Sequence, residues 1–272
     1  MNTGRVSDLP SALGEDGAVE RRLTGHKPAI FLDYDGVLTP IVDRPEDAVM
    51  SDDMRMTVRE LATRCPVCIV TGRDRAVVQQ LMGVDDLVVA GSHGFDIWTP
   101  QRGSITDDRV SGYVELITKV TERLREDVGA TPGVRIEPKR ASVAVHYRLV
   151  APQDRDRVVK SVQTLLAAHP DQVALTPGKM VYEIKPNVDW DKGKAVLHLI
   201  DVLGLGGDDV MPLYLGDDIT DEDAFRALRA RGIGIFVGRA DDPEVGDRET
   251  AAQFVLGSVD EVQRFLARLG RY

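Results

Sequence analysis

The stretch that decides the fold is Phe31-Leu32-Asp33-Tyr34-Asp35-Gly36-Val37-Leu38-Thr39. It continues the apolar run of residues 29–32, which ends in two aspartates, Asp33 and Asp35, separated by one residue. Side chains two positions apart in an extended backbone point the same way. Ligands of open α/β sheets bind beyond the carboxyl ends of the strands. We therefore expect two carboxylates to converge where a ligand would bind, although Asp and Gly are also common in solvated turns.

Four more short apolar runs follow, at residues 67–70, 87–90, 212–215 and 233–237. Continuous runs of this length are typical of strands covered on both faces of a parallel sheet. Amphipathic patterns predict helices at residues 51–64, 192–203, 221–231 and 259–269. The alternation of strands and helices predicts an α/β fold with a Rossmann-like, doubly wound parallel sheet.

The middle of the chain has a different pattern. It predicts a helix, two strands, a second helix and two more strands, at residues 112–128, 134–137, 142–149, 153–168, 172–175 and 179–184. Pro177-Gly178 is the turn signal between the last two strands. We interpret residues 112–186 as an α/β cap domain inserted into a core of residues 28–111 and 187–272. Residues 1–27, with scattered charge and glycine, are expected to form a mobile tail.

Length and charge limit the possible functions. The chain has 272 residues, with 34 Lys and Arg against 44 Asp and Glu and a net charge of −10. This charge excludes a general positive field for nucleic acid or anionic membranes. No apolar stretch approaches the ~18 residues of a membrane span, and residues 1–27 lack the apolar core of a signal peptide. We expect a cytoplasmic protein without a nucleic acid, membrane or obligate protein partner.

The two cysteines, Cys65 and Cys68, form a C-x-x-C pattern. Two cysteines exclude a disulfide framework, and we find no further ligands at the spacing of a zinc site. A redox motif of this kind normally opens a helix, whereas this one leads into the apolar run 67–70. The pattern favours packing in a buried strand over chemistry.

A second strand also ends in acids. The run 212–215 is followed by Gly216-Asp217-Asp218-Ile219-Thr220-Asp221-Glu222-Asp223. Thr220 and the three acids after it are explained by the start of a helix. A hydroxyl there can accept a hydrogen bond from a free backbone N–H group, and negative charge is favourable at the positive N-terminal end of the helix. Asp217 and Asp218 precede that helix and need another explanation. Oxygen ligands brought together from two strand ends suit Mg²⁺.

Two more positions complete a phosphate site. The run 67–70 leads into Thr71-Gly72-Arg73, which offers a hydroxyl, backbone N–H groups and a guanidinium. Lys192 lies at the start of a predicted helix, where N–H groups and an ammonium favour an anion. The carboxylates and a phosphate dianion would repel one another without two cations, Mg²⁺ and Lys192.

The predicted strands of the cap alternate between apolar and charged residues. One face is apolar and the other is rich in Lys, Arg and Glu. The alternation alone leaves two interpretations open, an ordinary solvated face or a surface that binds polyols and anions. His93, after another strand end, is likewise either a cleft residue or a structural loop residue.

Four motifs follow one another along the chain. They are D-x-D-G at residues 33–36, a threonine after a strand at residue 71, a lysine at residue 192 and G-D-D at residues 216–218. This order resembles the haloacid-dehalogenase-type phosphohydrolases, and the inserted domain resembles their larger α/β cap. Within that superfamily, several stretches are similar to the trehalose-6-phosphate phosphatase family, namely residues 32–41, 70–73, 91–94, 178–179, 183–186, 192–193 and 216–223.

The resemblance implies a mechanism. Asp33 is the nucleophile that forms an aspartyl-phosphate, and Asp35 is the general acid and base. Thr71 and Lys192 hold the phosphoryl oxygens, and Arg73 contacts the phosphate or the sugar. Mg²⁺ is held by Asp33, the backbone carbonyl of Asp35 and Asp217, with Asp218 and Asp221 placed to ligate it or to orient its waters.

The resemblance also implies a substrate. Five cap residues match positions that contact sugar hydroxyls: Glu137, Lys139, Arg148, Lys179 and Glu183. The implied activity is Mg²⁺-dependent hydrolysis of trehalose 6-phosphate to trehalose and phosphate. The alternatives are another sugar phosphatase of the same fold, acting on sucrose phosphate or a glycosyl-glycerate phosphate, a phosphomutase, or a non-catalytic phosphosugar-binding protein. The last could dispense with Asp33 or Asp35, and both are present.

Overall fold

The chain folds into two compact units. The computed structural model describes residues 4–105, 108–178 and 180–271. The core unit comprises Met1–Ser104 and Trp190–Tyr272, and the second unit comprises Ile105–Asp189. The second unit begins before residue 112, the start expected from the sequence, because its first helix already begins at Asp108.

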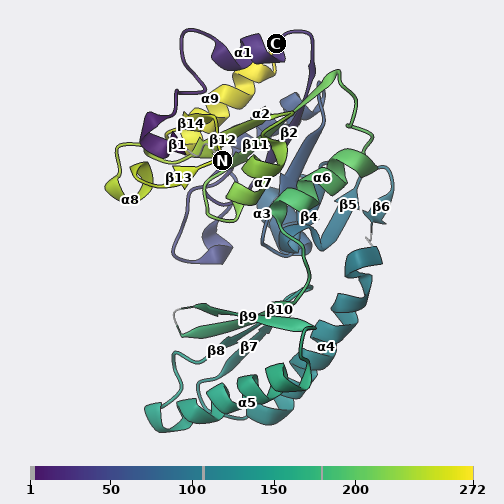
Figure 1. The fold of residues 1–272 in the computed structure, drawn as a ribbon, viewed down its shortest axis with the longest axis vertical. Coiled ribbons are helices and arrows are strands. Elements are labelled where there is room, and N and C mark those ends of the chain that lie inside the picture. The colour runs from purple at the N-terminus through teal and green to yellow at the C-terminus, as the bar shows by residue number, and fades with distance from the viewer. Residues whose placement is uncertain (1–3, 106–107, 179, 272) are drawn as a thin grey trace. The chain divides into compact units, whose positions relative to one another are not determined.

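An eight-stranded sheet forms the centre of the core unit, in the order β14-β12-β11-β2-β3-β4-β5-β6 (Figure 1). Six strands are parallel: β2 (Lys27–Leu32), β3 (Val67–Val70), β4 (Val88–Gly91), β11 (Val210–Gly216), β12 (Ile233–Val237) and β14 (Phe254–Leu256). At one edge, β5 (Asp96–Thr99) runs antiparallel to β4, and β6 (Gly103–Ile105) follows. The chain runs outward from β2 through β3 and β4 and returns on the other side of β2 for β11, β12 and β14. The predicted doubly wound α/β sheet is confirmed.

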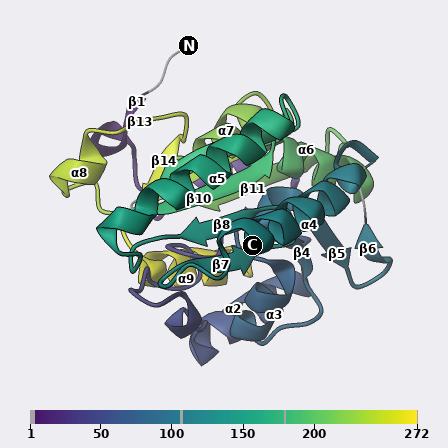
Figure 2. The ribbon, with the colours of Figure 1, turned by 90° about the horizontal axis from the view of Figure 1, so that it is seen from below.

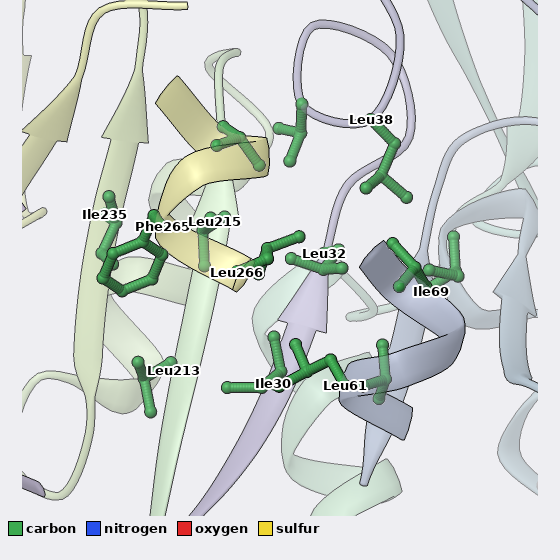
Figure 3. Packing of buried hydrophobic residues seen from close by; sticks show 14 of the residues in the cluster. Ile30, Leu32, Leu38, Leu61, Ile69, Leu213, Leu215, Ile235, Phe265 and Leu266 are labelled. Atoms are coloured by element: carbon green, nitrogen blue, oxygen red, sulfur yellow. The ribbon is translucent and has the colours of Figure 1, made fainter. Parts of the chain in front are cut away.

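Helices cover both faces of this sheet. Successive side chains of each strand point to opposite faces, and the side chains on both faces are apolar. One set packs against α2 (Asp52–Ala62), α3 (Arg75–Met82) and α9 (Val259–Leu269), and Figure 3 shows part of this cluster around Ile30 and Leu215. Tyr214 alternates with Leu215, so it points to the opposite face. There it meets Phe225 of α7 (Asp221–Leu228), with ring centroids 5.7 Å apart, and α7 packs beside α6 (Lys192–Val202).

The N-terminal residues differ from the expected mobile tail. Residues 4–27 contain β1 (Gly4–Arg5), the 3₁₀ turn Val6–Asp8 and α1 (Ala18–Leu23). Val6, Val19 and Leu23 are fully buried. β1 pairs with β13 (Glu249–Thr250), a partner more than 200 residues away. The segment is ordered by contacts distant in sequence, which its own composition does not reveal.

The second unit is a four-stranded antiparallel sheet in the order β7-β8-β10-β9. Its strands are β7 (Arg135–Pro138), β8 (Val143–His146), β9 (Val173–Gly178) and β10 (Val181–Pro186). The helices α4 (Asp108–Val128) and α5 (Arg155–Ala168) lie side by side over one face (Figure 2). Their apolar residues form one core with alternate residues of the sheet, such as Val145 and Ile184.

Two local predictions in this unit are wrong. β8 ends at His146 rather than at 149, and Leu149 lies in a turn with 83% of its surface exposed. Pro177 and Gly178 are not the turn, because they pair with Tyr182 and Val181 as the end of β9. The left-handed backbone that a tight turn requires occurs instead at Met180, with φ of 66°.

The remaining elements are short: the 3₁₀ turns Pro45–Asp47, Ser92–Gly94 and Pro152–Asp154, and the one-turn helix α8 (Pro243–Gly246).

Cys65 and Cys68 are free and buried, as the pattern favoured, and burial raises the pKa of the Cys65 thiol to about 11. None of the helices in the described part of the chain has the length and apolar character that a membrane span requires.

Candidate active site

The site residues follow neighbouring strands of the core sheet. Asp33 follows β2, Asp217 follows β11 on one side of it, and Thr71 follows β3 on the other side. These parallel strands end at the same edge of the sheet, where the chain reverses its direction of winding. Lys192 is the first residue of α6 and is only 3% exposed. The structure therefore brings together four residues that are far apart in sequence.

Lys192 forms a buried bridge between two carboxylates. Its Nζ donates to Oδ2 of Asp33 and to Oδ1 of Asp221, each at 2.6 Å. Burial opposes the charge of Lys192, but the two carboxylates outweigh it and hold its pKa above the usual value. Burial raises the pKa of Asp33 to about 7, although the Lys192 ammonium opposes the shift. The second oxygen of Asp33 accepts the backbone N–H of Tyr34 at 2.6 Å.

Asp221 holds the acidic loop in place. Its Oδ1 accepts from Lys192 and from the Tyr214 hydroxyl at 2.7 Å, and its Oδ2 accepts the backbone N–H groups of Asp217 and Asp218, each at 2.9 Å. Both oxygens of this fully buried side chain are thus used by donors. This favours a role in orienting the loop over direct metal ligation. The role of Tyr214 cannot be predicted from the sequence, where it is one residue of an apolar strand.

The acidic residues fit a hard divalent cation. Asp33, Asp217 and Asp221 each offer an oxygen atom, and these atoms lie within 4.8 Å of one another. Burial raises the pKa of Asp217 to about 8, and Asp33 adds to the shift. Among the described residues, none donates a hydrogen bond to the carboxylate of Asp217. In the same part of the chain, Lys192 is the one positively charged side chain bonded to these three acids. Oxygen ligands with excess negative charge are the donor set that Mg²⁺ prefers.

Gly36 fits closely against this group. Its φ is +71°, a conformation that L side chains rarely adopt. A Cβ built on Gly36 would lie 2.2 Å from Oδ2 of Asp217. The glycine of the D-x-D-G motif therefore allows the loop after β2 to approach the carboxylate of the second motif.

One predicted metal-site residue, Asp218, lies apart from this group, whereas Asp35 is expected to ligate through its backbone carbonyl and has a separate partner for its carboxylate. Asp218 is exposed and outside the group of three carboxylates. The Asp35 carboxylate is paired with Arg73, whose Nε and Nη2 donate to it at 2.6 and 2.7 Å. The third donor of Arg73, Nη1, bonds to the carbonyl of Pro45 at 2.7 Å. The structure thus connects Arg73 directly to the predicted acid–base residue.

Thr71 is buried directly after the end of β3. Its hydroxyl accepts the backbone N–H of Arg73 at 3.2 Å, and its carbonyl accepts the N–H of His93 at 2.8 Å. A Cβ on Gly72 would lie 2.7 Å from the His93 ring, so the ring packs directly on the loop after β3. Of the two roles left open for His93, this geometry favours the structural one.

The predicted sugar-binding residues belong to the second unit. Glu183 accepts from Lys139 Nζ at 3.0 Å and from Ser142 Oγ at 2.8 Å. The carboxylate of Glu137 is hydrogen-bonded to His146 Nε2 at 2.8 Å. Glu137 and Glu183 lie on the same polar face of the sheet, because both are directly opposite Ala144 on the strands that pair with β8. Arg148 lies in the turn after β8, and Lys179 lies outside the described residues. Ser142 was missed because an isolated serine carries no sequence signal.

The fold defines the class of protein. The structure superposes on that of a haloacid dehalogenase-like hydrolase from Bacteroides thetaiotaomicron with a TM-score of 0.60. The superposition covers 89% of this chain and 99% of that chain, and the two sequences are 15% identical. The solved trehalose-6-phosphate phosphatase of Aspergillus fumigatus gives a TM-score of 0.67, covering 97% and 99% of the two chains at 27% identity. The core therefore has the same fold as that haloacid dehalogenase-like hydrolase.

The sequence defines the family within this class. The trehalose-phosphatase family model matches residues 31–260, and the chain belongs to that family. A trehalose-phosphate phosphatase of Mycobacterium bovis strain BCG is 40% identical over 268 residues, which cover 98% of this chain and 67% of that protein. This chain spans only 20% of the length of an uncharacterized glycosyl hydrolase of Mycobacterium tuberculosis to which it is 41% identical.

Proposed function

We propose that this chain hydrolyses trehalose 6-phosphate to trehalose and inorganic phosphate, with Mg²⁺ as its cofactor. The observation that carries the proposal is the group of Asp33, Lys192, Asp217 and Asp221, buried except for the half-buried Asp217, in a chain that matches the trehalose-phosphatase family. Such a group combines a nucleophile, a fixed cation and a set of oxygen ligands at one point.

The reaction has two displacement steps at phosphorus. In the first, an oxygen of Asp33 forms a bond to phosphorus while the bond to the sugar oxygen breaks, and Asp35 donates a proton to that oxygen. In the second, water attacks phosphorus, Asp35 accepts the proton of the water, and Asp33 is regenerated as a carboxylate. Mg²⁺, held by Asp33, Asp217 and the Asp35 carbonyl, would neutralise phosphoryl charge when bound.

The surrounding residues prepare this reaction. Lys192 holds the Asp33 carboxylate in one orientation through its 2.6 Å bond and provides positive charge for the phosphoryl oxygens. Thr71 supplies a hydroxyl at the end of β3, and the backbone N–H of Arg73 donates to its oxygen, which leaves the hydroxyl proton to bond to a phosphoryl oxygen. Asp221 keeps the Asp217 loop fixed, so that little reorganisation is needed when the cation binds.

The second unit is proposed to be the specificity domain. Its polar face carries linked acids and bases, and a disaccharide offers many hydroxyls to such groups. The residues proposed to contact the sugar are Glu137, Lys139, Arg148, Lys179 and Glu183. A site that bonds substrate hydroxyls discriminates against an analogue that lacks them, because its polar groups are left unpaired.

A panel of sugar phosphates tests the proposal. Phosphate release in Mg²⁺ is measured for trehalose 6-phosphate, sucrose 6-phosphate, glucose 6-phosphate and a small aryl phosphate. We expect kcat/KM for trehalose 6-phosphate to exceed that for glucose 6-phosphate by about 100-fold or more. A faster reaction with sucrose 6-phosphate would overturn the substrate but leave the phosphatase chemistry. Binding without any phosphate release would favour the non-catalytic alternative.

A further inference from the structure

Both main-chain polar groups of Asp217 are held by side chains. Its N–H donates to Asp221 Oδ2 at 2.9 Å, and its carbonyl accepts a hydrogen bond from Nη1 of Arg248 at 3.3 Å. The Arg248 guanidinium also lies over the Phe236 ring, 5.1 Å from the centroid. Arg248 therefore bonds to the acidic loop while its charged group is kept in place by an aromatic face.

The segment that carries Arg248 contacts the acidic motif a second time. The backbone N–H of Ala251 donates to Oε2 of Glu222 at 2.8 Å. Glu222 is 5% exposed and follows Asp221 in the first turn of α7. Thr250 is buried between these two contacts. Residues 248–251 thus lie along the acidic motif and are bonded to it at both ends.

The N-terminal segment holds this stretch in turn. β13 pairs with β1 in a separate two-stranded sheet, with Gly4 opposite Thr250 and Arg5 opposite Glu249 (Figure 2). The N–H of Val6 donates to the carbonyl of Arg248 at 3.1 Å, and the Val6 side chain is fully buried. Within the described residues, β1 is the one strand that pairs with β13. Residues 4–6 therefore hold the carbonyl side of Arg248, while its N–H donates to the Val245 carbonyl at 3.1 Å.

We propose that Arg248 is a positioning residue for Asp217, and that residues 4–6 position Arg248. The proposal rests on the proposed function, because it assigns Asp217 to the cation site. A hydrogen bond from a guanidinium is stronger than one between neutral groups, and it fixes the peptide plane from which the Asp217 side chain extends. Groups that orient a metal ligand affect metal affinity without touching the metal. The N-terminal segment thereby acquires a role in the core site.

Two substitutions separate the two contacts. Arg248→Met removes the guanidinium and keeps an unbranched apolar side chain. Val6→Pro removes the N–H that bonds to Arg248 and keeps a small apolar side chain at this buried position, the first residue of a 3₁₀ turn, where proline is tolerated. Arg5, with φ of −86° and ψ of 150°, already has the backbone conformation that precedes proline. Arg5→Met is the matched control, because the Arg5–Asp247 ion pair is largely exposed.

The first measurement is amide hydrogen exchange at Asp217 and Asp218, without Mg²⁺ or substrate. We expect Arg248→Met to accelerate exchange at both amides by about tenfold, since loss of the bond frees the loop. Val6→Pro should act in the same direction, the double variant should add little to Arg248→Met, and Arg5→Met should leave exchange unchanged. The second measurement is the Mg²⁺ concentration that gives half of the maximal thermal stabilisation, which should rise about tenfold in Arg248→Met.

Unchanged exchange and Mg²⁺ response in a folded Arg248→Met variant would overturn the proposal. Additive effects of Val6→Pro and Arg248→Met would overturn the part that concerns residues 4–6. Arg248→Lys, which keeps the charge but not the planar group, should give an intermediate response. If trehalose 6-phosphate is not hydrolysed but exchange responds as expected, the proposed function fails and the positioning role stands. If hydrolysis occurs and exchange does not respond, the positioning role fails alone.

Discussion

Arg73 holds the carboxylate of Asp35 by two parallel hydrogen bonds, from Nε to Oδ2 at 2.6 Å and from Nη2 to Oδ1 at 2.7 Å. A planar guanidinium that binds both oxygens fixes the orientation of the carboxylate as well as its position. The bond from Nη1 to the Pro45 carbonyl fixes the guanidinium itself. The proposed acid–base residue is therefore oriented by a side chain from the next strand end.

Arg73→Lys should separate this role from simple phosphate binding. A lysine cannot bond to both oxygens of Asp35, so the proton is delivered less well to a sugar oxygen, which is a poor leaving group. We expect kcat for trehalose 6-phosphate to fall by about tenfold or more, and kcat for a small aryl phosphate to fall much less. An equal loss with both substrates would show that Arg73 acts on the phosphate rather than through Asp35.

Gly36→Ala tests the close approach of the two acidic motifs. The new Cβ would overlap the Asp217 carboxylate, so we expect a loss of about 100-fold in kcat/KM. Gly103→Ala is the matched control, because Gly103 has nearly the same φ, +70°, with nothing within 4 Å of a Cβ. It should cost about 1 kcal/mol of stability and leave activity unchanged. Wild-type activity in Gly36→Ala would contradict the proposed arrangement of Asp217.

Removal of metal should abolish activity, and Mg²⁺ should restore it. Without the cation the buried acids repel the phosphate of the substrate, and binding of Mg²⁺ should also raise the melting temperature. Asp217→Asn should raise the Mg²⁺ concentration required for both effects by about tenfold. Asp208→Asn, an exposed acid away from the site, serves as the control. Full activity after exhaustive chelation would refute the assignment of the cation.

Glu183→Gln tests the second unit as the specificity domain. The change weakens the pairing with Lys139 and Ser142 while keeping the shape of the side chain. We expect kcat/KM for trehalose 6-phosphate to fall by about tenfold and that for an aryl phosphate to stay unchanged. Glu115→Gln, on the exposed side of α4, is the control. Equal damage to both substrates would mean that Glu183 supports the fold rather than the sugar site.

The core sheet and its motifs could be predicted because they depend on local patterns. Apolar runs such as 67–70 and 233–237 have the continuous form of strands buried on both faces, and acids directly after such runs mark the site edge. The period-two pattern of the second unit likewise predicted an apolar and a polar face, and Glu137 and Glu183 lie on the polar one.

Features that depend on contacts distant in sequence could not be predicted. Val6 is isolated among polar residues, and its burial results from pairing with residues near 250. Tyr214 and Arg248 look like ordinary strand and loop residues, because their partners, Asp221 and the Asp217 carbonyl, are set by the tertiary fold. At Pro177 and Gly178 the local Pro-Gly pattern predicts a turn, but pairing with β10 extends the strand through both residues.

The proposed hydrolysis through Asp33 is tested most directly by the initial rate of phosphate release from trehalose 6-phosphate in Mg²⁺, measured for the unmodified chain and for Asp33→Asn. The amide has nearly the shape of the carboxylate, so the fold should persist, and the melting temperature verifies this. We predict hydrolysis by the unmodified chain and its loss in Asp33→Asn, because an amide cannot attack phosphorus. Absence of hydrolysis in the unmodified chain, or a folded Asp33→Asn variant with a rate within about tenfold of it, would contradict hydrolysis through Asp33.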